Sequence, residues 1–130
     1  MILNVSSVAS LLPVPQLAVY AASKAYVTSF SEALRAELRG SGVSVTALCP
    51  GPVSTEFSQV AARPGEVDEM GSPEFIRVPP WQVVHEALAA MVADRPRIIP
   101  GWVIWAAAVL IMSAPIALIR PVLSIRSKSR

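Results

Sequence analysis

Apolar and polar positions divide the first part of the chain into two strands and a long helix. Residues 2–5 are an apolar run that ends in small polar side chains, as expected of a buried strand. Between Val19 and Arg39, apolar side chains recur at intervals of three and four, which predicts an amphipathic helix. Gly40 and Gly42 would end this helix, and residues 43–49 predict a second strand. A strand, a helix and a strand in this order predict parallel strands and an α/β fold.

Each predicted helix carries one apolar stripe. In the first helix the stripe consists of Val27, Phe30, Leu34 and Leu38. The charged residues expected on its wetter side are Glu32, Arg35, Glu37 and Arg39. A second helix is predicted over Trp81 to Ala93, with one face formed by Val84, Leu88, Met91 and Val92.

Prolines and glycines mark the loops between these elements. Pro13 and Pro15 predict a loop over residues 8–18, because proline lacks a backbone donor and disfavours helix at the preceding residue. Residues 53–78 are polar and rich in Gly, Pro, Glu and Asp, which predicts a loop or lid. Residues 97–101 predict a short strand followed by a turn.

The segment from Ile98 to Ile119 contains no charged residue, and basic residues follow it. Its length of about 22 positions exceeds the roughly 18 at which a membrane helix becomes a candidate. Pro115 would kink a helix here, however. The uninterrupted stretch from Trp102 to Ala114 is too short to cross a hydrocarbon core of about 30 Å alone. The pattern therefore leaves a membrane segment and an ordinary apolar helix both open.

Composition and charge exclude several classes of protein. With 53% hydrophobic and 15% charged residues among 130, and a mean hydropathy of +0.53, the chain does not resemble a disordered protein. Its net charge of +2 is too small, and too concentrated at the C-terminus, for a nucleic-acid surface. Cys49 is the single cysteine and His85 has no second ligand at metal-binding spacing, so we expect no metal site. A signal-peptide pattern is absent from the sequence, and we expect a cytoplasmic protein.

Tyr20 and Lys24 are the first candidates for chemistry. They lie four residues apart near the start of the predicted helix, hence on one face about one turn apart. A cation beside a phenol favours the phenolate, so the pair would allow Tyr20 to act as a general acid or base. By itself the spacing is weak evidence, since both residue types are common on helix surfaces.

Two further candidates for chemistry lie where the predicted strands end. Both strand ends are at the same edge of the sheet, which is where open α/β sheets bind their ligands. Ser7 ends the first strand, 13 positions before Tyr20. Its hydroxyl would hydrogen-bond a substrate carbonyl while Tyr20 transfers a proton, or else it would only cap a turn. Residues 49–55 end the second strand, where backbone amides and the Thr55 hydroxyl would meet a ligand. Three elements are thus expected to converge.

The Asn-Val-Ser-Ser strand end, the Tyr-x-x-x-Lys helix and the Pro-Gly-x-Val-x-Thr loop, in this order, resemble the short-chain dehydrogenase/reductase family. The resemblance is close over residues 2–57. It implies an oxidoreductase that interconverts a carbonyl and a secondary alcohol by hydride transfer with a nicotinamide cofactor. It also implies that Ser7 polarises the carbonyl, that Tyr20 is the general acid/base, and that Lys24 holds the nicotinamide ribose. The residues that would contact the cofactor are Tyr20, Lys24, Pro50, Gly51, Val53 and Thr55.

The resemblance implies a Rossmann-like, doubly wound parallel sheet, of which only a part is expected. Members of the family begin with a Gly-x-x-x-Gly-x-Gly turn that binds the pyrophosphate, and no such turn precedes Ile2. We therefore expect residues 1–101 to be the carboxyl-terminal half of a catalytic domain, in a fragment of a longer enzyme. Residues 102–130 would be an apolar helical tail with a basic end. The determinant of NADP against NAD would lie outside the chain, and NADP is expected ahead of NAD.

Alternatives for function and for the tail stay open. The chain is either part of an oxidoreductase or a truncated, non-catalytic relative that acts as a dimerisation or membrane-associated module. The helix over Val19 to Arg39 would contact its copy in a homo-oligomer, as is common in the family. A tail of this kind covers the substrate cleft or contacts a subunit in relatives; otherwise Ile98 to Leu123 would attach the protein to a membrane. An apolar tail near the site favours a lipophilic carbonyl or alcohol substrate.

Overall fold

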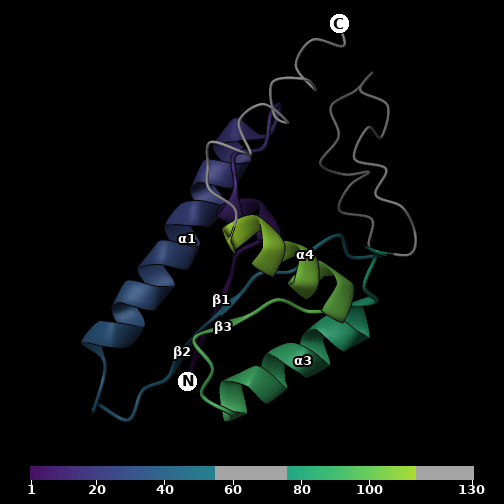
Figure 1. Cartoon of the computed structure of the whole chain (residues 1–130). Coiled ribbons are helices and arrows are strands. Elements are labelled where there is room, and N and C mark those ends of the chain that lie inside the picture. The colour runs from purple at the N-terminus through teal and green to yellow at the C-terminus, as the bar shows by residue number, and fades with distance from the viewer. Residues whose placement is uncertain (55–75, 114–130) are drawn as a thin grey trace, which may run out of the picture.

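A computed structural model describes residues 1–54 and 76–113 of the chain. Within this part, three parallel strands form one small sheet, in the order in which they occur in the sequence (Figure 1). The strands are β1 (Ile2–Val5), β2 (Val45–Leu48) and β3 (Arg97–Ile98). Val5 lies opposite Leu48, which in turn lies opposite Ile98. The predicted parallel α/β arrangement is confirmed, although β2 begins later than the apolar pattern predicts.

Helices cover both faces of the sheet (Figure 1). The helical elements are the 3-10 helix η1 (Val8–Leu11), α1 (Ala18–Glu37), α3 (Pro80–Val92) and α4 (Trp102–Ser113). The helices α1 and α4 cover the same face of the sheet. On this face Ala108 of α4 packs in an apolar cluster with Cys49, and the sulfur of Cys49 lies 3.7 Å from Oγ1 of Thr28 in α1. The helix α3 covers the opposite face, where Ala87 packs in a second cluster with Leu48. The predicted loop over residues 8–18 therefore contains one helical turn, η1.

The predicted apolar stripe of α1 is only partly buried: Val27, Leu34 and Leu38 are half-buried, and no member of the stripe is fully buried. The fully buried side chains of this helix are Ala21, Thr28 and Ser31, whereas Phe30 is exposed and stacks on Tyr26. Small side chains allow the helix to approach a sheet that is itself closely packed. Their hydroxyl groups are hydrogen-bonded, as a buried polar group requires: Ser31 donates to a backbone carbonyl and accepts from the side chain of a β1 residue.

The same correction applies to α3. Its buried side chains are Val83, Ala87 and Ala90. Of the predicted stripe, Met91 is half-buried, and the exposed members are Val84, Leu88 and Val92. The helical period was therefore right, but the periodicity of large apolar residues selected the outer face, because close packing against the sheet favours small residues.

The helix α4 is the described part of the predicted apolar tail. Its 12 residues extend about 18 Å at 1.5 Å per residue, which is less than the roughly 30 Å of a hydrocarbon core. Across residues 1–54 and 76–113, no helix combines the length and apolarity that crossing a bilayer requires. The rest of the predicted tail, residues 114–130, lies outside the described residues.

The predicted loop over residues 53–78 is described only at its two ends. Val53 and Val78 form an isolated parallel bridge. The amide of Val78 donates to the carbonyl of Pro52 at 2.9 Å, and the amide of Ser54 donates to the carbonyl of Val78 at 3.2 Å. This bridge joins the two ends of the loop next to the carboxyl end of β2. The intervening residues, 55–75, lie outside the described residues.

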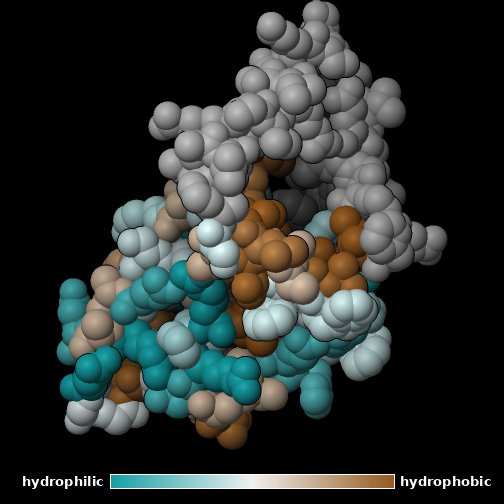
Figure 2. Space-filling model, in the orientation of Figure 1, coloured by the Kyte–Doolittle hydropathy of each residue, from teal (hydrophilic) through white to brown (hydrophobic). Residues whose placement is uncertain are grey.

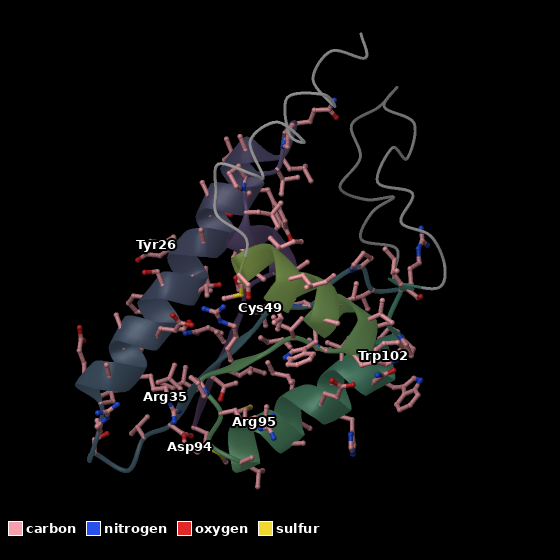
Figure 3. The ribbon with its side chains drawn as sticks, in the orientation of Figure 1. Tyr26, Arg35, Cys49, Asp94, Arg95 and Trp102 are labelled. Atoms are coloured by element: carbon pink, nitrogen blue, oxygen red, sulfur yellow. The ribbon has the colours of Figure 1, made fainter. Side chains whose placement is uncertain are left out.

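Arg35 faces the sheet rather than the wetter side of α1. Its Nη1 atom donates to the carbonyl oxygen of Val45 at 3.2 Å and to Oδ1 of Asp94 at 2.7 Å, and its Nη2 atom donates to the carbonyl oxygen of Asp94 at 2.8 Å. Figure 3 shows Arg35 and Asp94 close together at the end of α1 that lies away from η1. The hydrogen bond from Arg35 lowers the pKa of Asp94 below its usual value. The side chain thus joins α1, β2 and the turn before β3.

This contact predicts a pH dependence of stability. Because the pKa of Asp94 is lower in the folded chain, its contribution is fully present above the unfolded pKa near 3.9 and is lost as the pH falls through the folded value. We expect Asp94→Asn to lower the thermal midpoint slightly at pH 7, since the pair is exposed. The gap between the variant and the wild type should close as the pH falls from about 5 to about 3. Thermal melts followed by circular dichroism would measure it, and a gap that is unchanged at the lowest pH would contradict the assignment.

Candidate active site

The carboxyl ends of β1 and β2 lie side by side and continue as paired loops. The amide of Ser6 donates to the carbonyl oxygen of Leu48 at 2.7 Å, and the amide of Val8 donates to that of Pro50 at 3.0 Å. The serine-bearing end of β1 therefore runs along the loop that begins at Pro50. Two of the three elements predicted to converge are brought together by backbone hydrogen bonds.

Ser7 lies at the start of η1 with its side chain mostly buried, 8% exposed. Its Oγ atom accepts a hydrogen bond from the amide of Ala9 at 3.1 Å, as an N-cap residue does. A serine hydroxyl can also donate once, and within the described part of the chain no group accepts this proton. The turn-capping role foreseen as the alternative is therefore present, and it leaves the donor function of the hydroxyl available.

Lys24 connects the first turns of α1 to the end of β1. Its Nζ atom lies 5.7 Å from the centre of the Tyr20 ring and donates to the carbonyl oxygen of Val5 at 3.2 Å. An ammonium group has three donors, so this bond leaves two of them for other partners. The phenolic hydroxyl of Tyr20 makes no hydrogen bond within the described residues. The structure therefore places a cation beside a free phenol, and this cation is hydrogen-bonded to Val5, two positions before Ser7 in the sequence.

Ser6, which the sequence analysis passed over, anchors this part of α1. It is 2% exposed, and its Oγ atom donates to the carbonyl oxygen of Lys24 at 2.8 Å. The same atom lies 2.7 Å from Oγ1 of Thr28, which is 3.7 Å from the sulfur of Cys49. Because successive side chains of a strand point to opposite faces, one of two adjacent serines at a strand end must face the helix. This alternation is the signal in the sequence that could have identified Ser6 as a residue that contacts α1.

The predicted cofactor-lining residues after β2 have different surroundings. A Cβ atom on Gly51 would lie 2.9 Å from Cγ2 of Ile104, so α4 packs directly on this glycine. Val53 packs instead with the cluster on the α3 face of the sheet. Pro50 contacts the loop after β1 through its carbonyl group. Thr55 lies outside the described residues.

Glu86 of α3, a second residue missed from the sequence, fixes the start of α4. Its Oε2 atom accepts a hydrogen bond from the amide of Gly101 at 3.3 Å, and Oε1 accepts from the side chain of Gln82 at 2.7 Å. A carboxylate at the first turn of a helix is stabilised by the helix dipole. Glu86 therefore sets where α4 begins, and Ile104, two residues into the helix, then meets Gly51.

The family model described as short chain dehydrogenase matches residues 1–64, which span β1, η1, α1 and β2. Residues 1–64 belong to the short-chain dehydrogenase family. A sulfoacetaldehyde reductase of Chromohalobacter salexigens is 52% identical over 59 residues, which are 45% of this chain and 23% of that protein. The dehydrogenase match thus contains the predicted serine, the tyrosine and lysine pair, and the Pro-Gly loop.

Solved structures of short-chain dehydrogenases extend the match beyond residue 64. One from Sphingobium yanoikuyae, in complex with NADPH, is 26% identical with a TM-score of 0.67, covering 98% of this chain and 45% of that one. One from Burkholderia phymatum, in complex with NAD, is 26% identical with a TM-score of 0.65, covering 82% of this chain and 44% of that one. The chain therefore spans less than half the length of these proteins. The predicted Rossmann-like fold is confirmed for the part that the structure describes.

Proposed function

We propose that the chain provides the catalytic part of a nicotinamide-dependent oxidoreductase that interconverts a carbonyl and a secondary alcohol. The observation that carries this proposal is the position of Lys24. Its ammonium group lies beside the Tyr20 ring and is tied to the end of β1, two residues before Ser7. A general acid, a cation and a hydroxyl donor are what proton transfer to a carbonyl oxygen requires.

A nicotinamide cofactor is compatible with these residues. The free donors of Lys24 and the unbonded phenol of Tyr20 suit a hydroxyl-rich group such as a ribose. Pro50, Gly51 and Val53, together with Thr55 further along the chain, would line the nicotinamide. Since Ile104 fills the side of Gly51 where a Cβ would point, Gly51 would contribute only its backbone. When bound, the cofactor supplies or accepts the hydride.

In the proposed mechanism, this chain's residues handle the carbonyl oxygen and its proton. Ser7 keeps its acceptor bond to Ala9 and donates its free proton to the carbonyl oxygen of the substrate. Tyr20 gives its proton to the same oxygen in reduction and takes it back in oxidation. Lys24, whose ammonium group lies beside the ring of Tyr20, orients the ribose with its remaining donors.

Lys24→Ala tests this proposal in the full translation product of the gene. We expect the Kd for NADPH to rise about tenfold or more, since hydrogen bonds from a charged group contribute about 1.5–3 kcal/mol. We expect kcat to fall as well, because Tyr20 loses its cation. Fluorescence titration with NADPH and steady-state kinetics would measure the two effects. Arg39→Ala, which removes an exposed cation beyond the far end of α1, is the control and should change neither.

We also propose finer features of this oxidoreductase. Residues 1–101 would form the catalytic segment and residues 102–130 its tail. The enzyme would prefer NADP to NAD as cofactor, and its substrate would be a small lipophilic molecule. A homo-oligomer would form through α1, whose exposed apolar side chains Val19, Tyr26 and Phe30 are available for contact. Association with a membrane through Ile98 to Leu123 would take the form of attachment to a surface.

The alternative is a non-catalytic relative that serves as an assembly module. An in-frame Gly-x-x-x-Gly-x-Gly turn encoded upstream of Met1 would favour the oxidoreductase, because that turn binds the cofactor pyrophosphate. Absence of such a turn, together with no binding of NADPH by the full product, would favour the module.

A further inference from the structure

We propose that Ser6 is a positioning residue of the candidate active site, which holds the Tyr20 turn of α1 in place against Ser7. Ser6 stands at the end of a row of buried hydrogen-bond donors that begins at the thiol of Cys49. This inference rests on the proposed function, because it concerns how the same site is held together. It gives Ser6 no contact with substrate or cofactor.

Consecutive residues at the end of β1 hold Lys24 at both of its ends. The carbonyl oxygen of Val5 accepts from Nζ of Lys24 at 3.2 Å, and Oγ of Ser6 donates to the carbonyl oxygen of Lys24 at 2.8 Å. The next residue, Ser7, carries the hydroxyl proposed to bind the substrate. Tyr20 lies about one turn before Lys24 on the same face of α1. Of the two bonds, only that of Ser6 reaches the helix backbone, so it fixes the whole turn rather than one flexible side chain.

The single proton of each hydroxyl decides the direction of hydrogen bonding. Ser6 donates its only proton to Lys24, so its oxygen must accept from Oγ1 of Thr28, 2.7 Å away. Thr28 then has no proton left and accepts from the thiol of Cys49, whose sulfur lies 3.7 Å from Oγ1. We call Cys49, Thr28 and Ser6, in this order of donation, the donor series. Donors in such a row polarise one another, which strengthens each bond.

Thr28 departs from the usual behaviour of a threonine inside a helix. Such a hydroxyl often binds the carbonyl oxygen four residues earlier, as the hydroxyl of Ser31 does with Val27 at 2.6 Å. For Thr28 that carbonyl belongs to Lys24, and Ser6 binds it instead. The hydroxyl of Thr28 is thereby available to Ser6. The donor series is therefore a contact between helix and strand, and the helix alone does not produce it.

Solvent is nearly excluded from the donor series. All three of its residues are buried, and Cys49 is completely so. Figure 3 shows Cys49 between α1 and α4, and Ala108 of α4 packs in the cluster with it. Figure 2 shows hydrophobic side chains gathered over α4. Because no water replaces a missing partner here, removal of one hydroxyl leaves a buried group unpaired, which favours a shift of α1 against β1.

Ser6→Ala in the full translation product of the gene tests the positioning role. We expect kcat to fall by about 10- to 100-fold, because a displacement of about 1 Å at a reacting group has an effect of this size. The Kd for NADPH should change little, since Lys24 keeps the bond from its ammonium group to Val5. Steady-state kinetics and fluorescence titration would measure the two quantities. A normal kcat would overturn the proposal.

Two variants of Thr28 separate the hydroxyl from the packing, and they test the donor series even if Ser6→Ala does not fold. Thr28→Val keeps the branched shape and loses the hydroxyl, so kcat should fall by roughly tenfold. Thr28→Ser keeps the hydroxyl and loses a buried methyl group, which should lower the free energy of unfolding but leave kcat near that of the wild type. Equal losses of kcat in the two variants would overturn the proposal.

Ser31 provides the matched control. Its hydroxyl is as deeply buried at the same contact between α1 and β1, where it donates to Val27 and accepts from the side chain of Asn4 at 3.0 Å. Ser31→Ala removes this hydroxyl without removing a bond to Lys24. It should lower the free energy of unfolding, measured by denaturant titration, and leave kcat unchanged. A fall in kcat as large as that of Ser6→Ala would overturn the specific role of Ser6.

The Tyr20→Phe variant distinguishes failure of this inference from failure of the proposed function. If Ser6 acts by aligning Tyr20, adding Ser6→Ala to Tyr20→Phe should lower kcat little further, because residues that act as a unit are not additive. A full additional loss in the double variant would overturn the positioning role. A normal kcat in Ser6→Ala beside a large loss in Tyr20→Phe would overturn the positioning role and leave the proposed function intact. Normal turnover by Tyr20→Phe would overturn both.

Discussion

Replacing Tyr20 by phenylalanine should lower kcat of the full gene product by about 10²- to 10⁴-fold, the range in which a general acid or base contributes. The variant keeps the ring that lies 5.7 Å from the Lys24 ammonium and loses only the hydroxyl. The binding of NADPH should therefore change little. Steady-state kinetics and fluorescence titration separate the two effects, because loss of a proton donor acts on turnover rather than on cofactor affinity.

Tyr26 supplies the matched control for this prediction. It lies on the same helix, is exposed, and stacks on Phe30 without a neighbouring cation among the described residues. Tyr26→Phe removes the same hydroxyl from the outer side of α1 and should leave kcat unchanged. Near-normal turnover by Tyr20→Phe would refute the role of Tyr20, and a comparable loss in both variants would point to a general effect on the helix.

Gly101→Ala should lower the free energy of unfolding by about 2–4 kcal/mol. The residue has a φ of +83°, a conformation that costs an alanine about 1 kcal/mol. In addition, a Cβ atom there would lie 2.8 Å from Cγ2 of Val78, and overpacking of this kind costs about 1–3 kcal/mol. Denaturant titration of the chain, followed by circular dichroism, would measure the loss.

Gly40 isolates the conformational part of that effect. Its φ of +86° is nearly the same, and no atom lies within 4 Å of the position that a Cβ would take. Gly40→Ala should therefore cost only about 1 kcal/mol. Equal losses in the two variants would show that the contact with Val78 contributes nothing.

Glycines at the ends of helices also show how the fold supports the site. The positive φ values of Gly40 and Gly42 confirm the predicted end of the long helix, where only the backbone conformation matters. Gly101 combines such a backbone with close packing and with the hydrogen bond to Glu86, and the helix that follows it places Ile104 on Gly51. A disturbance at Gly101 is therefore expected to reach the loop after β2.

The candidate site was predicted in part because its signals are local. The four-residue spacing of Tyr20 and Lys24 fixes their neighbourhood on any helix, and the structure places them together. Ser6 and Glu86 escaped prediction because their partners, Lys24 and Gly101, are 18 and 15 residues away in the sequence. No local pattern carries information about contacts of that kind.

The sequence by itself determined the order and the approximate extent of the main elements, because hydrophobic period, proline and glycine act on neighbouring residues. It also determined the order of the residues proposed to carry chemistry. Only the tertiary structure decided which side of each helix is buried. Packing against the closely filled sheet selected Ala21, Thr28 and Ser31 over the large residues of α1, and it turned Arg35 inward to Asp94. Burial depends on the shape and hydrogen bonds of distant partners, which periodicity does not encode.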